Sequence, residues 1–159
     1  MIEKKKAHYQ KNKEHYAEYH RKYKVEHRDE INAFFRKYYH ERKNADPIFK
    51  LASQVRGTIQ DSFRHRGYRK DTKAAELTGL CSADMTDYLI ETFRNNYGRE
   101  WDGVEAVHID HIIPLATAES IDDVKRLCHY TNLQLLTAED NLRKRDSLDY
   151  EITTPQERM

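Results

Sequence analysis

Apolar residues are sparse at the start of the chain, where they recur at helical spacing. Residues 1–46 contain no Gly and no Pro, and they are rich in the strong helix formers Lys, Glu, Arg and Ala. Four aromatic residues at heptad-like spacing predict a single stripe on a charged helix. They are Tyr9, Tyr16, Tyr19 and Tyr23. We predict one helix from about residue 3 to 43, roughly 60 Å long, which is too long to bury against so small a domain.

This stretch also repeats itself. Residues 12–23 are echoed fifteen residues later by residues 27–38, so that Tyr19 corresponds to Phe34 and Tyr23 to Tyr38. Such repetition indicates one structural unit that is used more than once.

The helical pattern is predicted to break at Asp46-Pro47 and to start again. Asp46 can cap a new helix, and Pro47 suits its first position. A helix over about 47–65 would be ended by Gly67. Its apolar face would consist of Ile48, Leu51, Val55, Ile59 and Phe63.

Two more helices and a loop are expected before the pattern changes. We predict a short helix near residues 73–78 and a longer one capped by Ser82, with Met85, Leu89 and Phe93 among its apolar residues. The segment 95–98, Asn-Asn-Tyr-Gly, is typical of a loop.

From residue 104 the pattern favours strands as well as helices. Residues 104–110 alternate in part, residues 118–130 suit a helix capped by Ser120, and residues 132–136 suit a strand. Thr137 and Asp140 resemble a capping box that opens a final helix to about residue 144. The fold class is therefore α+β, with a loosely ordered tail after residue 146.

Charge divides the chain more sharply than its net value of +1 suggests. Residues 1–75 hold 20 Lys and Arg against 10 Asp and Glu, whereas residues 76–159 hold 8 against 17. A basic half suits a polyanion and an acidic half suits a divalent cation. Attraction between the two halves, or to a second subunit, explains the same asymmetry.

Composition excludes some classes of protein. No apolar run approaches the length of about 20 residues that a membrane span needs, and the first residues lack the apolar segment of a secretion signal. We expect a soluble, cytoplasmic protein. Cys81 and Cys128 are far apart, which argues against a disulfide or a zinc knuckle and favours two buried thiols.

The densest cluster of chemically active residues is His108-Ile109-Asp110-His111. Asp is a hard oxygen ligand suited to Mg²⁺, and His accepts a proton near neutral pH. Neighbours on a straight strand point to opposite faces, so Asp110 and His111 can share a site only where the strand ends or bends. Asn141 and Lys144 are three residues apart and would share one helical face.

Three segments that contain these residues, 108–115, 130–136 and 139–144, resemble the motif segments of HNH (ββα-metal) endonucleases. The pattern is the Asp-His…Asn…Asn variant. Together with the Tyr- and Lys-rich leader, most of the chain is similar to small HNH proteins common in phages and large DNA viruses.

The resemblance implies His111 as the general base that activates a water molecule. It implies Asp110 and Asn141 as ligands of a single Mg²⁺ ion, for which Mn²⁺ would substitute. The final motif residue is Asn and not His, which favours hard ions over zinc.

Supporting roles are implied as well. Asn132 corresponds to the residue whose hydrogen bonds brace the loop between the strands and the base. Lys144 corresponds to a basic residue that contacts phosphate, and His108 to an additional active-site His.

Basic residues elsewhere are candidates for contacts with nucleic acid. On the leader these are Arg21, Lys22, Arg36 and Lys37, and in the middle of the chain Arg56, Arg64, Arg66 and Arg69. The leader could instead pair with a second copy as a coiled coil, or stand alone as an exposed helix held by charge pairs.

The sequence therefore predicts a long basic helix at 1–45 that serves as a DNA-binding arm, a helical subdomain at 46–100, a module at 101–148 that the resemblance implies to be an HNH nuclease, and a tail at 149–159. The expected function is metal-dependent hydrolysis of double-stranded DNA. A monomer would nick, and double-strand cleavage would need a homodimer. Two alternatives stay open: a DNA-binding module with a weak or vestigial nuclease site, and an RNA-directed nuclease.

Overall fold

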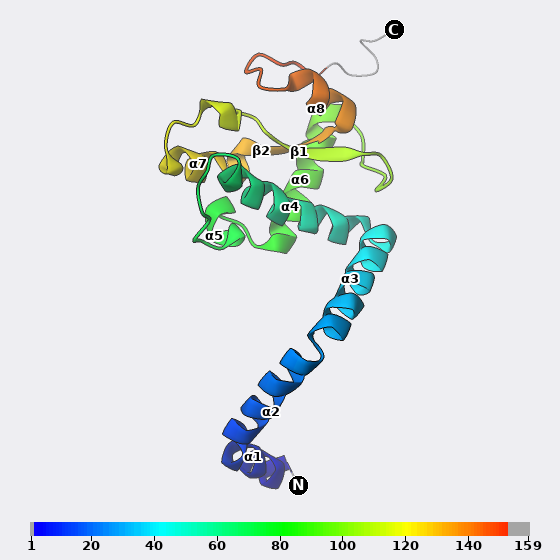
Figure 1. The fold of residues 1–159 in the computed structure, drawn as a ribbon. Helices are drawn as coiled ribbons and strands as arrows, with labels where there is room; N and C mark the ends of the chain where they lie inside the picture. The colour runs from blue at the N-terminus through cyan, green and yellow to red at the C-terminus, as the bar shows by residue number, and fades with distance from the viewer. Residues whose placement is uncertain (1, 153–159) are drawn as a thin grey trace. The chain divides into compact units, whose positions relative to one another are not determined.

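The computed structural model describes residues 2–152 (Figure 1). Two compact units make up the chain, an N-terminal unit of residues Met1–Ala45 and a C-terminal unit of residues Asp46–Met159. The last residues of the predicted tail, 153–159, lie outside the described part.

The N-terminal unit consists of three helices and not of one. These are α1 (Ile2–Lys11), α2 (Lys13–Glu26) and α3 (Arg28–Ala45). The helix is interrupted at Asn12 and His27, whose φ angles are −111° and −105°. The Asn12 amide donates to the backbone carbonyl of His8 at 2.9 Å, a local bond that competes with helical pairing. The two interruptions are fifteen residues apart, at equivalent positions of the repeat, so the repeat corresponds to a structural unit.

No residue of α2 or α3 is buried, and residues of the aromatic stripe contact one another and neighbouring His side chains. Tyr9 stacks on Tyr16 with ring centroids 6.0 Å apart, and Tyr19 stacks on Tyr23 at 6.3 Å. Weak ion pairs recur with the repeat, since Lys22–Glu26 and Lys37–Glu41 are both separated by 3.9 Å. Exposed pairs of this kind contribute little to stability.

The C-terminal unit opens with α4 (Pro47–Arg64). Its start agrees with the prediction, because the Asp46 carboxylate accepts a hydrogen bond from the backbone N–H of Phe49 at 2.9 Å. Leu51, Val55, Ile59 and Phe63 are buried as expected. Ile48 is 48% exposed, and its predicted burial is wrong because the core residues of α4 begin only one turn later.

Helices α5 (Ala74–Thr78) and α6 (Ser82–Tyr97) follow. Cys81 and not Ser82 precedes α6 as its N-cap, and no side chain caps that end. The predicted loop at 95–98 is wrong, since α6 continues to Tyr97 and ends at Gly98, whose φ is +64°. Tyr97 is buried and hydrogen-bonded to Asp140, and this tertiary contact overrides the local turn signal.

A two-stranded antiparallel sheet follows, with β1 (Val107–His111) paired to β2 (Leu133–Thr137). Between the strands are η1 (Leu115–Thr117), α7 (Ile121–Leu127) and η2 (Tyr130–Asn132), and α8 (Ala138–Lys144) follows β2 directly. Ser120 caps α7 as predicted. The mixture of helices with a small antiparallel sheet agrees with the predicted α+β class, and Asn132 lies in η2 and not in the strand.

The core is formed by α4 and α6 against the sheet, with α8 on the opposite side in the view of Figure 1. Cys128 is buried and Cys81 is exposed, so the prediction of two buried thiols is wrong for Cys81, which begins a helix at the surface. None of the helices that the structure describes has the length and apolar character needed to cross a bilayer.

Candidate active site

The short connection from β2 to α8 brings the final helix back beside β1. Asn141 and Lys144 lie on one face of α8 and meet two residues of β1. The Asn141 side-chain nitrogen is 3.0 Å from Nδ1 of His108, and Lys144 Nζ is 3.1 Å from Oδ2 of Asp110. His108 and Asp110 are two residues apart on the strand, about 7 Å. The fold thus gathers four residues that the sequence singled out.

Asp110 and Lys144 form a buried ion pair. Asp110 is 8% exposed and Lys144 is 4% exposed. The ammonium group also donates to the backbone carbonyl of His111 at 2.9 Å, and Gln134 donates its amide N–H to Asp110 at 2.9 Å. Lys144 was expected to contact phosphate, but in this structure its ammonium group is directed into the protein.

His111 is 8% exposed, and its Nε2 atom is buried without a hydrogen-bond partner among the described residues. Burial, and to a lesser degree the positive charge of Lys144, lower the pKa of His111 from 6.5 to about 4. Both effects disfavour the charged imidazolium. The ring is therefore neutral at physiological pH and has a nitrogen free to accept a proton.

Asn132 holds the segment that follows β1. Its carboxamide oxygen accepts from the backbone N–H of Ile113 at 2.8 Å, and its amide nitrogen donates to the carbonyls of Ile113 and Leu127 at 3.1 and 2.9 Å. The backbone carbonyl of Asn132 accepts from Ile112 at 2.9 Å. These bonds tie the two residues after His111 to the end of α7, which is the kind of bracing that the resemblance implies.

The chemical types of the donor atoms at this site suit a hard divalent ion. The carboxylate oxygens of Asp110 and the carboxamide oxygen of Asn141 belong to the ligand types that such ions accept. Among residues 2–152, no group of three His, Cys, Asp or Glu residues is arranged to hold a metal.

A cavity of about 400 Å³ gives access to the site. His108, Ile109 and Asn141 form one wall, and α4 forms the other with Gln54, Gly57, Thr58 and Asp61. A second cavity of about 160 Å³ shares Gln54 and His108 with the first. A substrate can thus reach His108 and Asn141 directly, whereas Asp110, His111 and Lys144 lie deeper.

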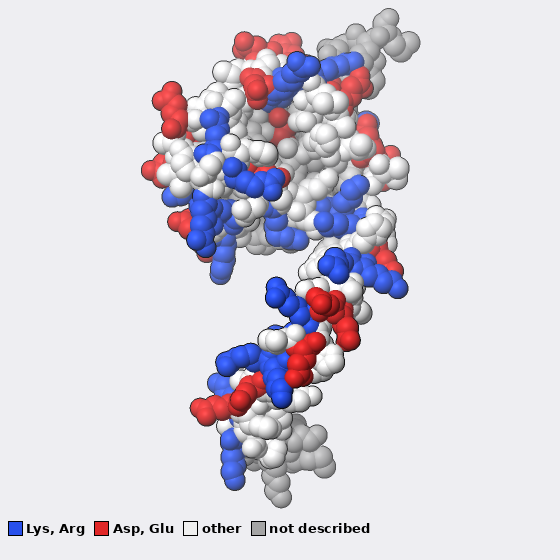
Figure 2. Space-filling model, viewed as in Figure 1, with Lys and Arg blue, Asp and Glu red and all other residues white. Residues whose placement is uncertain are grey.

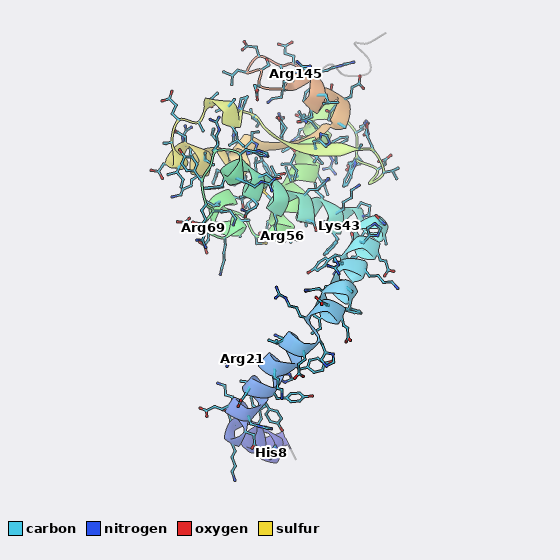
Figure 3. All side chains as sticks on the ribbon, in the orientation of Figure 1. His8, Arg21, Lys43, Arg56, Arg69 and Arg145 are labelled. Carbon is cyan, nitrogen blue, oxygen red and sulfur yellow. The ribbon has the colours of Figure 1, made fainter. Side chains whose placement is uncertain are left out.

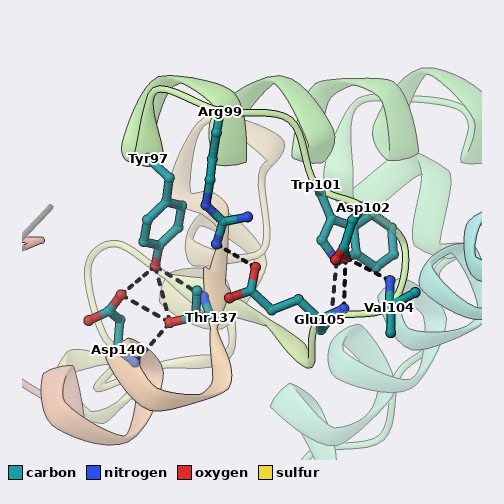
Figure 4. A network of polar contacts seen from close by, with 8 residues as sticks. All are labelled: Tyr97, Arg99, Trp101, Asp102, Val104, Glu105, Thr137 and Asp140. Carbon is teal, nitrogen blue, oxygen red and sulfur yellow. Dashed lines mark hydrogen bonds and ion pairs between the residues drawn. The ribbon is translucent and has the colours of Figure 1, made fainter. Parts of the chain in front are cut away.

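A second polar network fixes the corner between β2 and α8 (Figure 4); the sequence predicted that Thr137 caps α8 in it, but not the contacts of Tyr97. The Tyr97 hydroxyl donates to Asp140 at 2.7 Å and accepts from the backbone N–H of Thr137 at 3.0 Å. Tyr150 also donates to Asp140 at 2.7 Å, so the tail is held at this point. Burial is the main cause that raises the pKa of Tyr97 to about 12. The network attaches α8 to α6 and so positions Asn141, the next residue after Asp140.

Gln134 was also missed. The signal that could have found it is the strand register, because Gln134 pairs with Asp110 across the sheet.

The predicted nucleic-acid contacts are divided between the two units of the chain. On the leader, the predicted residues Arg21, Lys22, Arg36 and Lys37 are all exposed. Lys, Arg, Asp and Glu side chains are interspersed along this unit in Figure 2.

In the C-terminal unit, Arg66 is partly exposed and donates to the backbone carbonyl of Leu115. Arg64 pairs with Asp61 at 2.9 Å, and Arg56 donates to Ser53 at 3.3 Å. Arg56 and Arg69 are labelled in Figure 3, and both are exposed.

Comparison with known proteins adds no relative, since no family model, no curated protein and no solved structure matches the chain.

Proposed function

We propose that this protein is a metal-dependent DNA endonuclease of the HNH type. The observation that carries the proposal is the set of side-chain contacts between β1 and α8. There the Asp110–Lys144 pair and the His108–Asn141 pair meet on a strand–strand–helix arrangement, although the partners are 34 and 33 residues apart in the chain. This arrangement supports the roles that the sequence resemblance implies.

In the proposed reaction, the neutral imidazole of His111 accepts the proton of the attacking water, and its Nε2, buried in this structure, must become accessible to that water for the step to occur. Asp110 and Asn141 would hold the divalent ion, which when bound stabilises negative charge on the phosphate oxygens, and His108 would lie beside them. Asn132 keeps the segment beside His111 in place. Lys144 compensates the Asp110 carboxylate when no other cation does so.

A supercoiled-plasmid assay tests the proposal. We expect relaxed circles with Mg²⁺ or Mn²⁺ and none with EDTA. Loss of general-base assistance in His111→Ala should lower the rate by about 10²–10⁴-fold. Leu142→Ala is the matched control, because Leu142 follows Asn141 on α8 and is 68% exposed. Equal nicking by His111→Ala and wild type would contradict the proposal.

One observation favours the alternative of a DNA-binding module with a vestigial site. The Asp110 carboxylate is already neutralised by Lys144, and the Asn141 nitrogen, not its oxygen, faces His108. Calorimetric titration with Mg²⁺ separates the two functions. DNA binding without saturable Mg²⁺ uptake and without nicking would favour the binding module, and preferential cleavage of an RNA duplex would favour the RNA-directed nuclease.

A further inference from the structure

One face of α4 forms a continuous wall along both cavities beside the candidate site. Lys50, Gln54 and Thr58 are spaced four residues apart and therefore lie on the same side of the helix. They cover about 12 Å of helix length. Gln54 and His108 line both cavities, so the two cavities are neighbours along α4, and together they are called the groove.

The chemistry of this groove suits a strand of nucleic acid. Lys50 is exposed and supplies a positive charge at one end. Within residues 2–152, neither the Gln54 carboxamide nor the Thr58 hydroxyl has a hydrogen-bond partner. Amide and hydroxyl groups of this kind bind base edges and sugars. Asp61, the acid at the other end, is already paired with Arg64 at 2.9 Å.

Two further residues of the groove, Gly57 and Trp101, favour the binding of a ligand. A Cβ atom added at Gly57 would meet nothing within 4 Å, so this position of the wall opens onto free space. Trp101 lines the same end of the groove as Lys50, with its indole N–H donated to the carbonyl of Glu105 at 3.0 Å. Aromatic rings in such grooves provide surfaces for base stacking.

We propose that this groove, formed by Lys50, Gln54, Gly57, Thr58, Trp101 and His108, binds the DNA strand that is cleaved. Lys50 contacts a backbone phosphate, and Gln54 and Thr58 hydrogen-bond the nucleotides that lead to His108 and Asn141. This assignment rests on the proposed endonuclease function. It moves the expected contact on α4 away from Arg56, which lies two residues from Gln54 and hence about 200° around the helix.

Trp101 allows the groove to be tested without catalysis, because it is the single Trp of the chain. A DNA duplex of mixed sequence is titrated into the full-length protein in EDTA, and Trp emission is recorded beside the anisotropy of labelled DNA. We expect saturable quenching of Trp101. Lys50→Ala should weaken binding about tenfold and reduce the slope of log K against log salt by about 0.9. Gln54→Ala should weaken binding without changing that slope.

Gly57→Leu should fill the groove and abolish the quenching. Leu has a higher helix propensity than Gly, and thermal unfolding should show that the variant is folded. Arg56→Ala is the matched control on the opposite side of α4 and should retain quenching. DNA binding by the wild type without quenching of Trp101, or quenching that persists in Gly57→Leu, would contradict the proposal that the groove binds DNA.

The two proposals fail in different ways. If Gly57→Leu nicks plasmid as well as the wild type, the proposed endonuclease function is supported and the proposed role of the groove in DNA binding is wrong. If Gly57→Leu abolishes the quenching but the wild type does not nick plasmid with any divalent ion, the proposed role of the groove is supported and the proposed endonuclease function is wrong.

Discussion

Replacing Lys144 with Met would remove the positive charge that compensates a buried carboxylate. In the wild type, Lys144 Nζ is 3.1 Å from Asp110 and 2.9 Å from the His111 carbonyl, and both side chains of the ion pair are almost fully buried. Met is an unbranched side chain that can fill much of the same space. The substitution therefore tests charge more than packing.

The expected loss of stability follows from these contacts. Removing one partner of a buried ion pair costs about 3–5 kcal/mol because the other charge is left uncompensated. An Asp110 left without its cation can also become neutral by taking up a proton. For an ordinary aspartate at pH 7 this costs about 4 kcal/mol, so the loss of stability in Lys144→Met cannot exceed that value. We therefore expect a loss of about 3–4 kcal/mol, a large share of the 5–15 kcal/mol that holds a typical domain together.

Urea denaturation followed by circular dichroism measures this loss, which corresponds to a shift of the midpoint by about 2 M. The double variant Asp110→Asn/Lys144→Met removes both charges and should recover most of the stability. It also provides a folded protein if the single variant does not fold. A loss below about 1 kcal/mol in Lys144→Met would show that the pair behaves like a solvated surface pair, and the reasoning would be wrong.

Three more perturbations have defined outcomes. The folded-state pKa of His111, about 4, lies below the ordinary value of 6.5, so stability that is complete above pH 6.5 should fall by up to about 3 kcal/mol as the pH drops through 4. In EDTA, the stability of His111→Leu should lack this fall at low pH. Identical profiles of stability against pH for the variant and the wild type would contradict the lowered pKa of His111. Asn132→Ala leaves the backbone groups of Ile113 and Leu127 without partners and should cost about 1–3 kcal/mol in urea denaturation; a change within 0.5 kcal/mol would place it with ordinary surface substitutions. Deleting residues 1–45 should weaken DNA binding and make its salt dependence shallower, while the C-terminal unit unfolds cooperatively as before; unchanged affinity would argue against a DNA-binding role for the leader.

Local signals in the sequence predicted local structure well. The Asp46 cap, Pro47 at the first position of α4 and the Ser120 capping box of α7 all involve groups within one helical turn of each other. The interruptions at Asn12 and His27 were local as well, but the high helix propensity of their neighbours concealed them.

The candidate site was predictable in its residue types but not in its internal contacts. The sequence indicated Asp110, His111 and Asn141, and the turn from β2 into α8 brings that region together. That Lys144 binds Asp110 instead of facing solvent follows from the depth at which α8 packs on β1. Spacing within one helix carries no information about that depth.

By itself, the sequence determined most of the capped helices and the α+β composition, because propensity, capping and periodicity act between neighbours in the chain. Only the tertiary structure decided that Tyr97 holds Asp140, that Lys144 neutralises Asp110 and that α4 forms a groove beside His108. Each of these contacts joins groups at least 34 residues apart, and their meeting depends on how helices and strands pack.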